Sequence, residues 1–132
     1  MATIFTKIIN GEIPSYKIAE NDYCYAFLDI SPLEKGHTLV VPKQEIDYIF
    51  DMDDTLLCEL NLFAKKIAKA IEATVDCRKV GIAVIGLEVA HAHIHLVPLT
   101  EVGDLDFKRE KKHFTDEQFK AIAASIADKI TL

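Results

Sequence analysis

Residues 91–97 are His91-Ala92-His93-Ile94-His95-Leu96-Val97, and three of the chain's five histidines alternate here with apolar residues. Successive side chains of a β-strand point to opposite faces of the sheet. A strand over Ala90–Leu99 therefore places the three imidazoles on one face and the apolar side chains on the other. The apolar face predicts contact with a core. The imidazole face predicts contact with a ligand, a metal ion or solvent.

Three interpretations of the imidazole face compete. Hydrogen-bonded histidines on a half-exposed strand need no function, but a strict alternation of three such uncommon residues argues against chance. A shared metal ion is disfavoured, because His91 and His95 are separated by roughly 13 Å along a strand and zinc–nitrogen bonds measure about 2.0–2.1 Å. A metal would need two of these rings and another ligand, for which His37 is the candidate. Nucleophilic catalysis on phosphorus is favoured, since one imidazole attacks while others donate to phosphate oxygens.

Composition limits the class of protein. A chain of 132 residues with 50% hydrophobic and 27% charged residues suits a single domain over residues 1–132. The formal net charge of −6 disfavours nucleic-acid binding, because phosphate neutralisation needs a surplus of Lys and Arg. The three cysteines form no CxxC and are expected to be free thiols. Without a signal pattern or an apolar run of about 18 residues, we expect a cytoplasmic protein with no membrane partner.

The hydrophobic pattern predicts an α+β fold with an antiparallel sheet covered by helix. Apolar residues from Leu56 to Ile71 recur every three or four positions, which is typical of an amphipathic helix. Thr115 and Gln118 fit a capping box, whereas the mixed-charge run at 108–113 is interpreted as solvated surface. The predicted elements are, in order, a short helix over Ile4–Ile9, strands over Ile18–Glu20, Tyr23–Leu28 and Thr38–Val41, a long helix over Asp53–Val75, strands over Lys79–Ile85 and Ala90–Leu99, and a helix over about 115–130.

The sequence resembles the histidine triad (HIT) family, whose signature is His-φ-His-φ-His-φ-φ with φ apolar. Residues 91–97 match it at every position. Residues 4–14 and 26–43 resemble the N-terminal and nucleoside-binding segments of the family's Hint branch, so the resemblance covers about residues 4–99. It implies a HIT-like antiparallel sheet of about five strands with one long helix, to which this chain adds a C-terminal helix. It also implies a homodimer.

The resemblance implies a small-molecule nucleotide as ligand and no cofactor. By motif position, His93 is the nucleophile at the α-phosphorus, His95 contacts the phosphate, and the backbone carbonyl of His91 fixes the tautomer of His93. His37 would line the phosphate end of the cleft, and Asp29 would accept hydrogen bonds from ribose hydroxyls. The base would occupy an apolar slot formed by Ile4, Phe5, Ile8, Phe27 and Ile30.

The activity expected from the resemblance is nucleotide hydrolysis or nucleotidyl transfer, with a phosphoramidate-type substrate. Two alternatives stay open: a dinucleoside polyphosphate hydrolase and a catalytically idle nucleotide-binding module. The turn before the triad bears on the choice, because many members have Gly-Gln-Ser/Thr-Val where this chain has Gly86-Leu87-Glu88-Val89. A glutamate beside a phosphate repels it, so the leaving group depends on how this turn is placed.

Some bacterial members of the family hold a structural zinc partly through an N-terminal Cys-x-x-Cys. Thr3 and Thr6 occupy the matching positions here, and structural zinc sites are built from thiolates and imidazoles rather than hydroxyls. We therefore predict that the purified protein contains no zinc, which elemental analysis measures directly. One zinc per chain would contradict this prediction.

Overall fold

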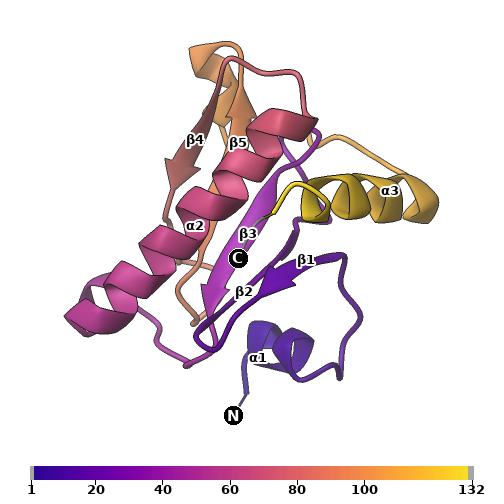
Figure 1. The fold of residues 1–132 in the computed structure, drawn as a ribbon. Coiled ribbons are helices and arrows are strands. Elements are labelled where there is room, and N and C mark those ends of the chain that lie inside the picture. The colour runs from indigo at the N-terminus through magenta and orange to yellow at the C-terminus, as the bar shows by residue number, and fades with distance from the viewer. Residues whose placement is uncertain (1, 131–132) are drawn as a thin grey trace.

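The computed structural model describes residues 2–130 (Figure 1). Its sheet is antiparallel with the strand order β1-β2-β3-β5-β4, which confirms the α+β fold predicted from the sequence. The elements are α1 (Ile4–Ile9), β1 (Lys17–Glu20), β2 (Cys24–Leu28), β3 (Thr38–Pro42), a 3-10 turn at Ile49–Asp51, α2 (Asp54–Thr74), β4 (Lys79–Ala83), β5 (Ile94–Leu99), a 3-10 turn at Val102–Leu105 and α3 (Asp116–Ala127).

The two faces of the sheet carry different helices. Ala26 belongs to the core cluster that contains the buried side chains of α2 and α3. The next residue, Phe27, belongs to a second cluster with Phe5 of α1. Because neighbouring side chains of a strand point to opposite faces, α1 lies on one face of the sheet, and α2 and α3 lie on the other (Figure 1).

The long helix α2 forms where the apolar stripe predicts it. The side chain of Asp53 caps its first turn by accepting from the backbone N–H of Leu56 at 2.9 Å, which satisfies one of the unpaired donors of the helix start. The buried residues of α2 include the whole predicted stripe, and each fully buried aliphatic or aromatic side chain contributes about 1.5–3 kcal/mol. These stripe residues are Leu56, Leu60, Phe63, Ile67 and Ile71.

The C-terminal helix α3 begins at the predicted capping box, in which Thr115 and Gln118 each bond the other's backbone N–H. It ends at Ala127, earlier than the expected residue 130. Tyr16 beside β1 fastens it to the sheet, because its ring stacks on Phe119 with centroids 4.8 Å apart and its hydroxyl donates to Asp116 at 2.6 Å.

The predicted strand over Ala90–Leu99 is wrong in its first part, since β5 begins at Ile94. The ladder with β3 pairs Val40 with Ile94 and continues toward Leu96. β3 ends at Pro42, which has no N–H to extend the ladder. Upstream of β5, the N–H of Ala92 donates instead to the carbonyl of Ile46 at 2.7 Å. His91 and His93 therefore lie before the strand, His91 in a bend and His93 just ahead of Ile94. The alternation persists, because Ala92, Ile94 and Leu96 still belong to the core below α2.

The outer strands of the sheet differ in their cover. α3 packs on β1 at one edge. At the other edge, β4 ends at Ala83 rather than Ile85, and Ile82, Val84 and Ile85 are 55%, 40% and 46% exposed.

Among residues 2–130, no helix combines the length and apolar composition needed to cross a bilayer.

Candidate active site

Four histidines from two parts of the chain meet on the α1 side of the sheet, and all are buried: His37, His91, His93 and His95 are 1%, 0%, 7% and 8% exposed. His37 directly precedes β3 and follows Gly36, whose φ is +93°. That left-handed conformation favours glycine. A Cβ at Gly36 would also lie 2.9 Å from Cγ2 of Val75, so the turn that delivers His37 depends on this glycine.

The His93 ring is oriented by its own chain. Its Nδ1 lies 2.9 Å from the backbone carbonyl oxygen of His91, which is the contact that the resemblance implies. A carbonyl oxygen only accepts, so Nδ1 carries the proton of the neutral ring and Nε2 keeps its lone pair. The Phe5 ring packs edge-on against His93, with centroids 4.9 Å apart. The arrangement holds His93 in the tautomer that a nucleophile needs.

The His91 ring is fixed on both sides. Nε2 donates to the Pro42 carbonyl at 2.8 Å, so Nδ1 accepts from the Thr3 hydroxyl, also at 2.8 Å. Glu45 accepts from the Thr3 N–H at 2.7 Å and from the Thr6 hydroxyl at 2.6 Å. These bonds lower the pKa of the Glu45 carboxyl. The network fastens the start of α1 to the triad through Thr3 and Thr6, the two residues at which some members of the family have cysteines.

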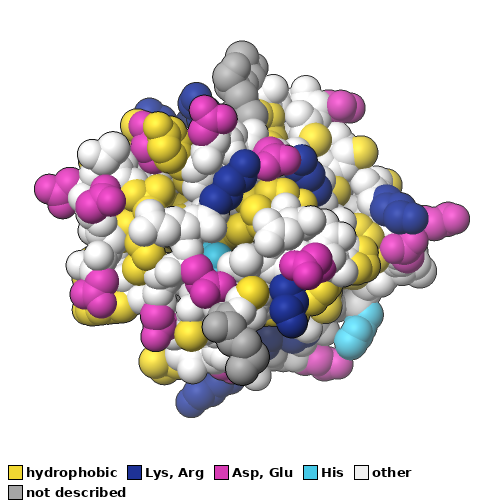
Figure 2. All heavy atoms as spheres, turned by 90° about the horizontal axis from the view of Figure 1, so that it is seen from below, with side chains coloured by type: hydrophobic (Ala, Val, Ile, Leu, Met, Phe, Trp, Pro, Cys, Tyr) yellow, Lys and Arg dark blue, Asp and Glu magenta, His cyan; other side chains and the backbone are white. Residues whose placement is uncertain are grey.

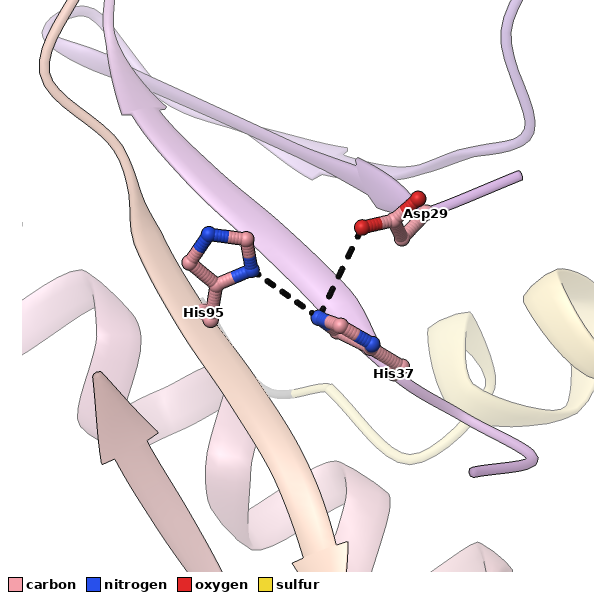
Figure 3. A group of neighbouring side chains, drawn as sticks. All are labelled: Asp29, His37 and His95. Carbon is pink, nitrogen blue, oxygen red and sulfur yellow. Dashed lines mark hydrogen bonds and ion pairs between the residues drawn. The ribbon is translucent and has the colours of Figure 1, made fainter. Parts of the chain in front are cut away.

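A second set of hydrogen bonds fixes the protons of His37 and His95 (Figure 3). The N–H of Leu33 donates to Nδ1 of His37 at 3.0 Å, so the proton of neutral His37 lies on Nε2. This Nε2 is 3.0 Å from Nδ1 of His95 and must donate to it, which leaves the proton of His95 on its Nε2. Burial is the largest cause that lowers the pKa of His37 to about 3 and that of His95 to about 4. Both rings are therefore neutral at physiological pH.

Asp29 lies beside this pair, immediately after β2 (Figure 3). Its Oδ1 accepts from the N–H of Ser31 at 2.8 Å, and its Oδ2 is 3.6 Å from Nε2 of His37. Burial raises the pKa of the carboxyl, while the Ser31 bond opposes that change. Its side chain remains 19% exposed, so a carboxylate oxygen can still accept from a ligand.

Asp29, His37 and His95 also form the candidate metal cluster of the described residues, with ligand atoms within 4.8 Å of one another. The Leu33 bond argues against metal binding here. A metal ion needs a lone pair on Nε2 of His37, but Nδ1 already uses its lone pair to accept from Leu33. Binding would require either a doubly deprotonated ring or loss of that hydrogen bond. The geometry fits a hydrogen-bond relay better than a metal site.

The structure brings together only part of the predicted base slot. Phe5, Ile8 and Phe27 are buried in one cluster on the α1 side of the sheet, and the Phe5 and Phe27 rings lie 5.7 Å apart. Ile4 is 48% exposed and Ile30 is 72% exposed. Ile30 does not belong to that cluster. It lines a separate hollow of about 560 Å³ that lies between α3 and residues 14–17.

Residues 86–90 place their unusual side chains in solvent. Gly86 has a φ of +69°, and Leu87 is 88% exposed. Glu88 is exposed as well. In the described part of the chain, Glu88 has no hydrogen bond or ion pair with any of the site histidines. The expected repulsion between this glutamate and a bound phosphate is therefore weakened by solvent.

Sequence reasoning missed the aromatic wall beside His95. The centroid of the Phe107 ring lies 4.7 Å from that of His95. The acidic segment around Phe107 carries no motif from which this contact could have been predicted. The interpretation of residues 108–113 as solvated surface is wrong for Arg109. Its Nη2 donates to the carbonyl oxygens of Leu33 and Asp104 at 3.1 and 2.7 Å.

The face of the molecule seen in Figure 2 carries charges of both signs among hydrophobic side chains. A histidine near its middle is visible only in part between its neighbours. This face shows no continuous basic surface of the kind that tracks a nucleic-acid backbone.

Comparison with known proteins agrees with the fold. The family model described as "HIT domain" matches residues 10–102, and the chain belongs to the HIT family. It is 39% identical to an uncharacterized HIT-like protein of Borreliella burgdorferi over 94% of this chain and 95% of the relative. It is 33% identical to the adenosine 5'-monophosphoramidase hnt1 of Schizosaccharomyces pombe over 98% of this chain and 99% of that protein. The crystal structure of a Hit-like protein involved in cell-cycle regulation from Bartonella henselae superposes with a TM-score of 0.83, at 30% identity, covering 97% of this chain and 96% of the other.

The buried neutral histidines predict a loss of stability in mild acid. Between pH 6.5 and pH 4 the unfolded chain binds protons that folded His37 and His95 exclude, because folding lowers both pKa values. The free energy of unfolding therefore falls as pH decreases through this window, by about 2 kcal/mol at pH 5 for each such histidine. Urea unfolding at pH 7, 6 and 5 measures this. His95→Asn should flatten the dependence, whereas exposed His113→Asn should keep it. Equal pH dependence in wild type and His95→Asn would contradict the argument.

Proposed function

We propose that this chain, acting as a single HIT domain, hydrolyses a nucleoside 5'-phosphoramidate through a covalent nucleotidyl-histidine on His93. The observation that carries the proposal is the 2.9 Å hydrogen bond between Nδ1 of His93 and the His91 carbonyl. In the neutral form of this buried imidazole it leaves a lone pair on Nε2, and such a group is a competent nucleophile. The fission-yeast relative named adenosine 5'-monophosphoramidase supports the choice of substrate class.

The proposed reaction has two displacements at the same phosphorus. Nε2 of His93 attacks the α-phosphorus, the phosphorus–nitrogen bond of the substrate breaks, and the amine leaves with a proton taken from solvent or a nearby donor. Water then attacks the phosphorus, the bond to Nε2 breaks, the nucleoside monophosphate leaves, and the proton lost by water returns to solvent. Catalysis depends on in-line positioning and on stabilising charge on the phosphate oxygens, and the scheme needs no metal ion or cofactor.

The neighbouring residues receive distinct roles in this proposal. Nε2 of His95 carries a proton and donates to a phosphate oxygen. His37 is 1% exposed and therefore acts through His95 as a positioning residue instead of touching the phosphate. His91 orients His93 through its carbonyl, and Asp29 accepts from the ribose hydroxyls. The base lies against the apolar slot of Phe5, Ile8 and Phe27, of which Ile4 forms the exposed margin.

We further propose a cytoplasmic setting and a ligand that is a free nucleotide, not a nucleic acid. Cys24, Cys58 and Cys77 are free, which suits a reducing compartment. The chain's net charge of −6 weakens any contact with a polyphosphate backbone.

Turnover of adenosine 5'-phosphoramidate tests the proposal, and a diadenosine polyphosphate tests the nearest alternative. We expect release of AMP from the phosphoramidate by wild-type protein, and at least about a 10³-fold loss in His93→Ala, because the nucleophile is gone. Exposed His113→Ala is the matched control and should keep wild-type turnover.

Each outcome of this assay is decisive. Turnover of the dinucleotide alone would assign the chain to the dinucleoside polyphosphate hydrolases. Calorimetric binding of AMP without turnover of either substrate would identify an idle nucleotide-binding module. Full activity of His93→Ala on the phosphoramidate would refute the covalent scheme.

We also propose that the chain forms a homodimer through the free edge of the sheet at β4. The five residues of β4 are all exposed or half-buried, whereas the five residues of β2 and of β3 are all buried. Ile82, Val84 and Ile85 add an apolar strip at this edge. An uncovered apolar edge strand readily pairs with another strand, and a second copy of β4 is complementary to it under two-fold symmetry.

Ile82→Lys should convert the dimer to a monomer, because it places a charge in the middle of the proposed interface. Sedimentation velocity measures the mass directly. Tyr23→Lys alters a 49% exposed side chain at the β1–β2 turn and should leave the dimer intact. A monomeric wild-type protein at micromolar concentration, or a dimeric Ile82→Lys variant, would exclude this interface.

A further inference from the structure

We propose that residues 104–112 form a clasp over the phosphate end of the site, in which Phe107 is a positioning residue that holds the His95 ring and keeps water from the His37–His95 hydrogen bond. The clasp lies beyond residues 10–102, which the HIT family model matches. Its effect on turnover rests on the proposed function, whereas its effect on the two histidines does not.

Phe107 touches both members of the pair. Its ring meets His95 edge-on, with centroids 4.7 Å apart and an interplanar angle of 73°. It also meets His37 edge-on, at 6.1 Å and 77°. Edge-to-face contacts of this kind favour one ring orientation over others. Phe107 is half-buried, whereas both imidazoles are almost fully buried, so Phe107 forms the outer wall of the pair.

The clasp is bonded to the loop that fixes His37. Nη2 of Arg109 donates to the Leu33 carbonyl at 3.1 Å and to Glu34 at 3.1 Å, and the N–H of Lys112 donates to the Pro32 carbonyl at 2.8 Å. Leu33 is also the residue whose N–H sets the tautomer of His37. Residues 32–34 therefore hold both the clasp and the His37 ring, which fixes the position of Phe107 relative to the two histidines.

Three titratable groups lie close to the His95 ring: His93 precedes it on the same segment, and His37 and Asp29 come from the ends of β3 and β2. The charge of Lys111, in the clasp, acts on His37 and Asp29. The Lys111 ammonium donates to the carbonyl oxygens of residues 107 and 109 at 2.6 and 3.0 Å. Burial, followed by repulsion from His93, accounts for the low pKa of His95. Water entering in place of the Phe107 ring would relieve the burial and raise this pKa.

Protonation of His95 would break the relay. Nδ1 of a protonated ring carries a hydrogen, which would point at the hydrogen on Nε2 of His37, and two donors cannot bond each other. Without Phe107 the pair should therefore separate in mildly acidic solution. With Phe107 in place, it stays bonded down to about the pKa of 4 that His95 has in the intact site.

NMR titration of the histidine Cε1–Hε1 groups tests the clasp without any substrate. In Phe107→Ala the pKa of His95 should rise from about 4 toward its ordinary value of 6.5. Phe107→Leu keeps an apolar cover and should stay close to wild type. Phe50→Ala removes the same kind of ring from a 74% exposed position and should change nothing. A folded Phe107→Ala variant in which His95 titrates as in wild type would overturn the proposal.

Two further measurements complete the test. If Phe107→Ala does not fold, Arg109→Gln releases the clasp from Leu33 and should raise the pKa of His95 in the same direction; an unchanged pKa overturns the proposal. In the phosphoramidate assay, the acidic limb of the kcat/KM profile should move to higher pH in Phe107→Ala and return in Phe107→Leu. Wild-type protein without turnover refutes the proposed function alone, because the NMR titration still decides the role of Phe107.

Discussion

The hydrogen bond from Nδ1 of His93 to the carbonyl oxygen of His91 joins two residues that are next but one in the chain. It can form because the chain has not yet entered the sheet at this point, since β5 begins only at Ile94. In a longer strand, the His91 carbonyl would face a backbone donor on a neighbouring strand. Both ladders of β5 stop before His91, at the Val40–Ile94 pair with β3 and at the Ala83–His95 pair with β4. That carbonyl is therefore free for an imidazole, which determines the nitrogen of His93 that keeps a lone pair.

A second backbone group sets the opposite tautomer in His37 and His95. The N–H of Leu33 places a proton on Nε2 of His37, and this proton leaves His95 with its own proton on the far nitrogen. The site thus presents a lone pair on Nε2 of neutral-form His93 beside an N–H on Nε2 of His95, although both residues are histidines. Under the proposed function, neutral donors would let a chain with a net charge of −6 hold a phosphate without a cluster of Lys and Arg.

Periodicity in the sequence predicts the elements of this fold because each depends mainly on its own residues. The stripe of α2 and the capping box of α3 are local signals, and both are confirmed. The start of β5 is not local, because it depends on where β3 ends in another part of the chain. The same holds for Glu45, whose bonds to Thr3 and Thr6 join segments far apart in sequence. The resemblance supplies His37 as a site residue, but only the structure shows that it is buried behind His95.

Phe107 and Arg109 lie outside the part of the chain that matches the family, so the family motif alone does not determine the chemistry of the site. The part of the chain that matches the family contains all four site histidines and Asp29, and these residues define the tautomers. Whether His37 and His95 also stay neutral depends on water access, because burial is the largest cause of their low pKa values. That burial is supplied in part by a segment outside the family match. Two proteins with the same triad can therefore differ in the pH range over which Nδ1 of His95 accepts from His37, according to the side chain that covers it.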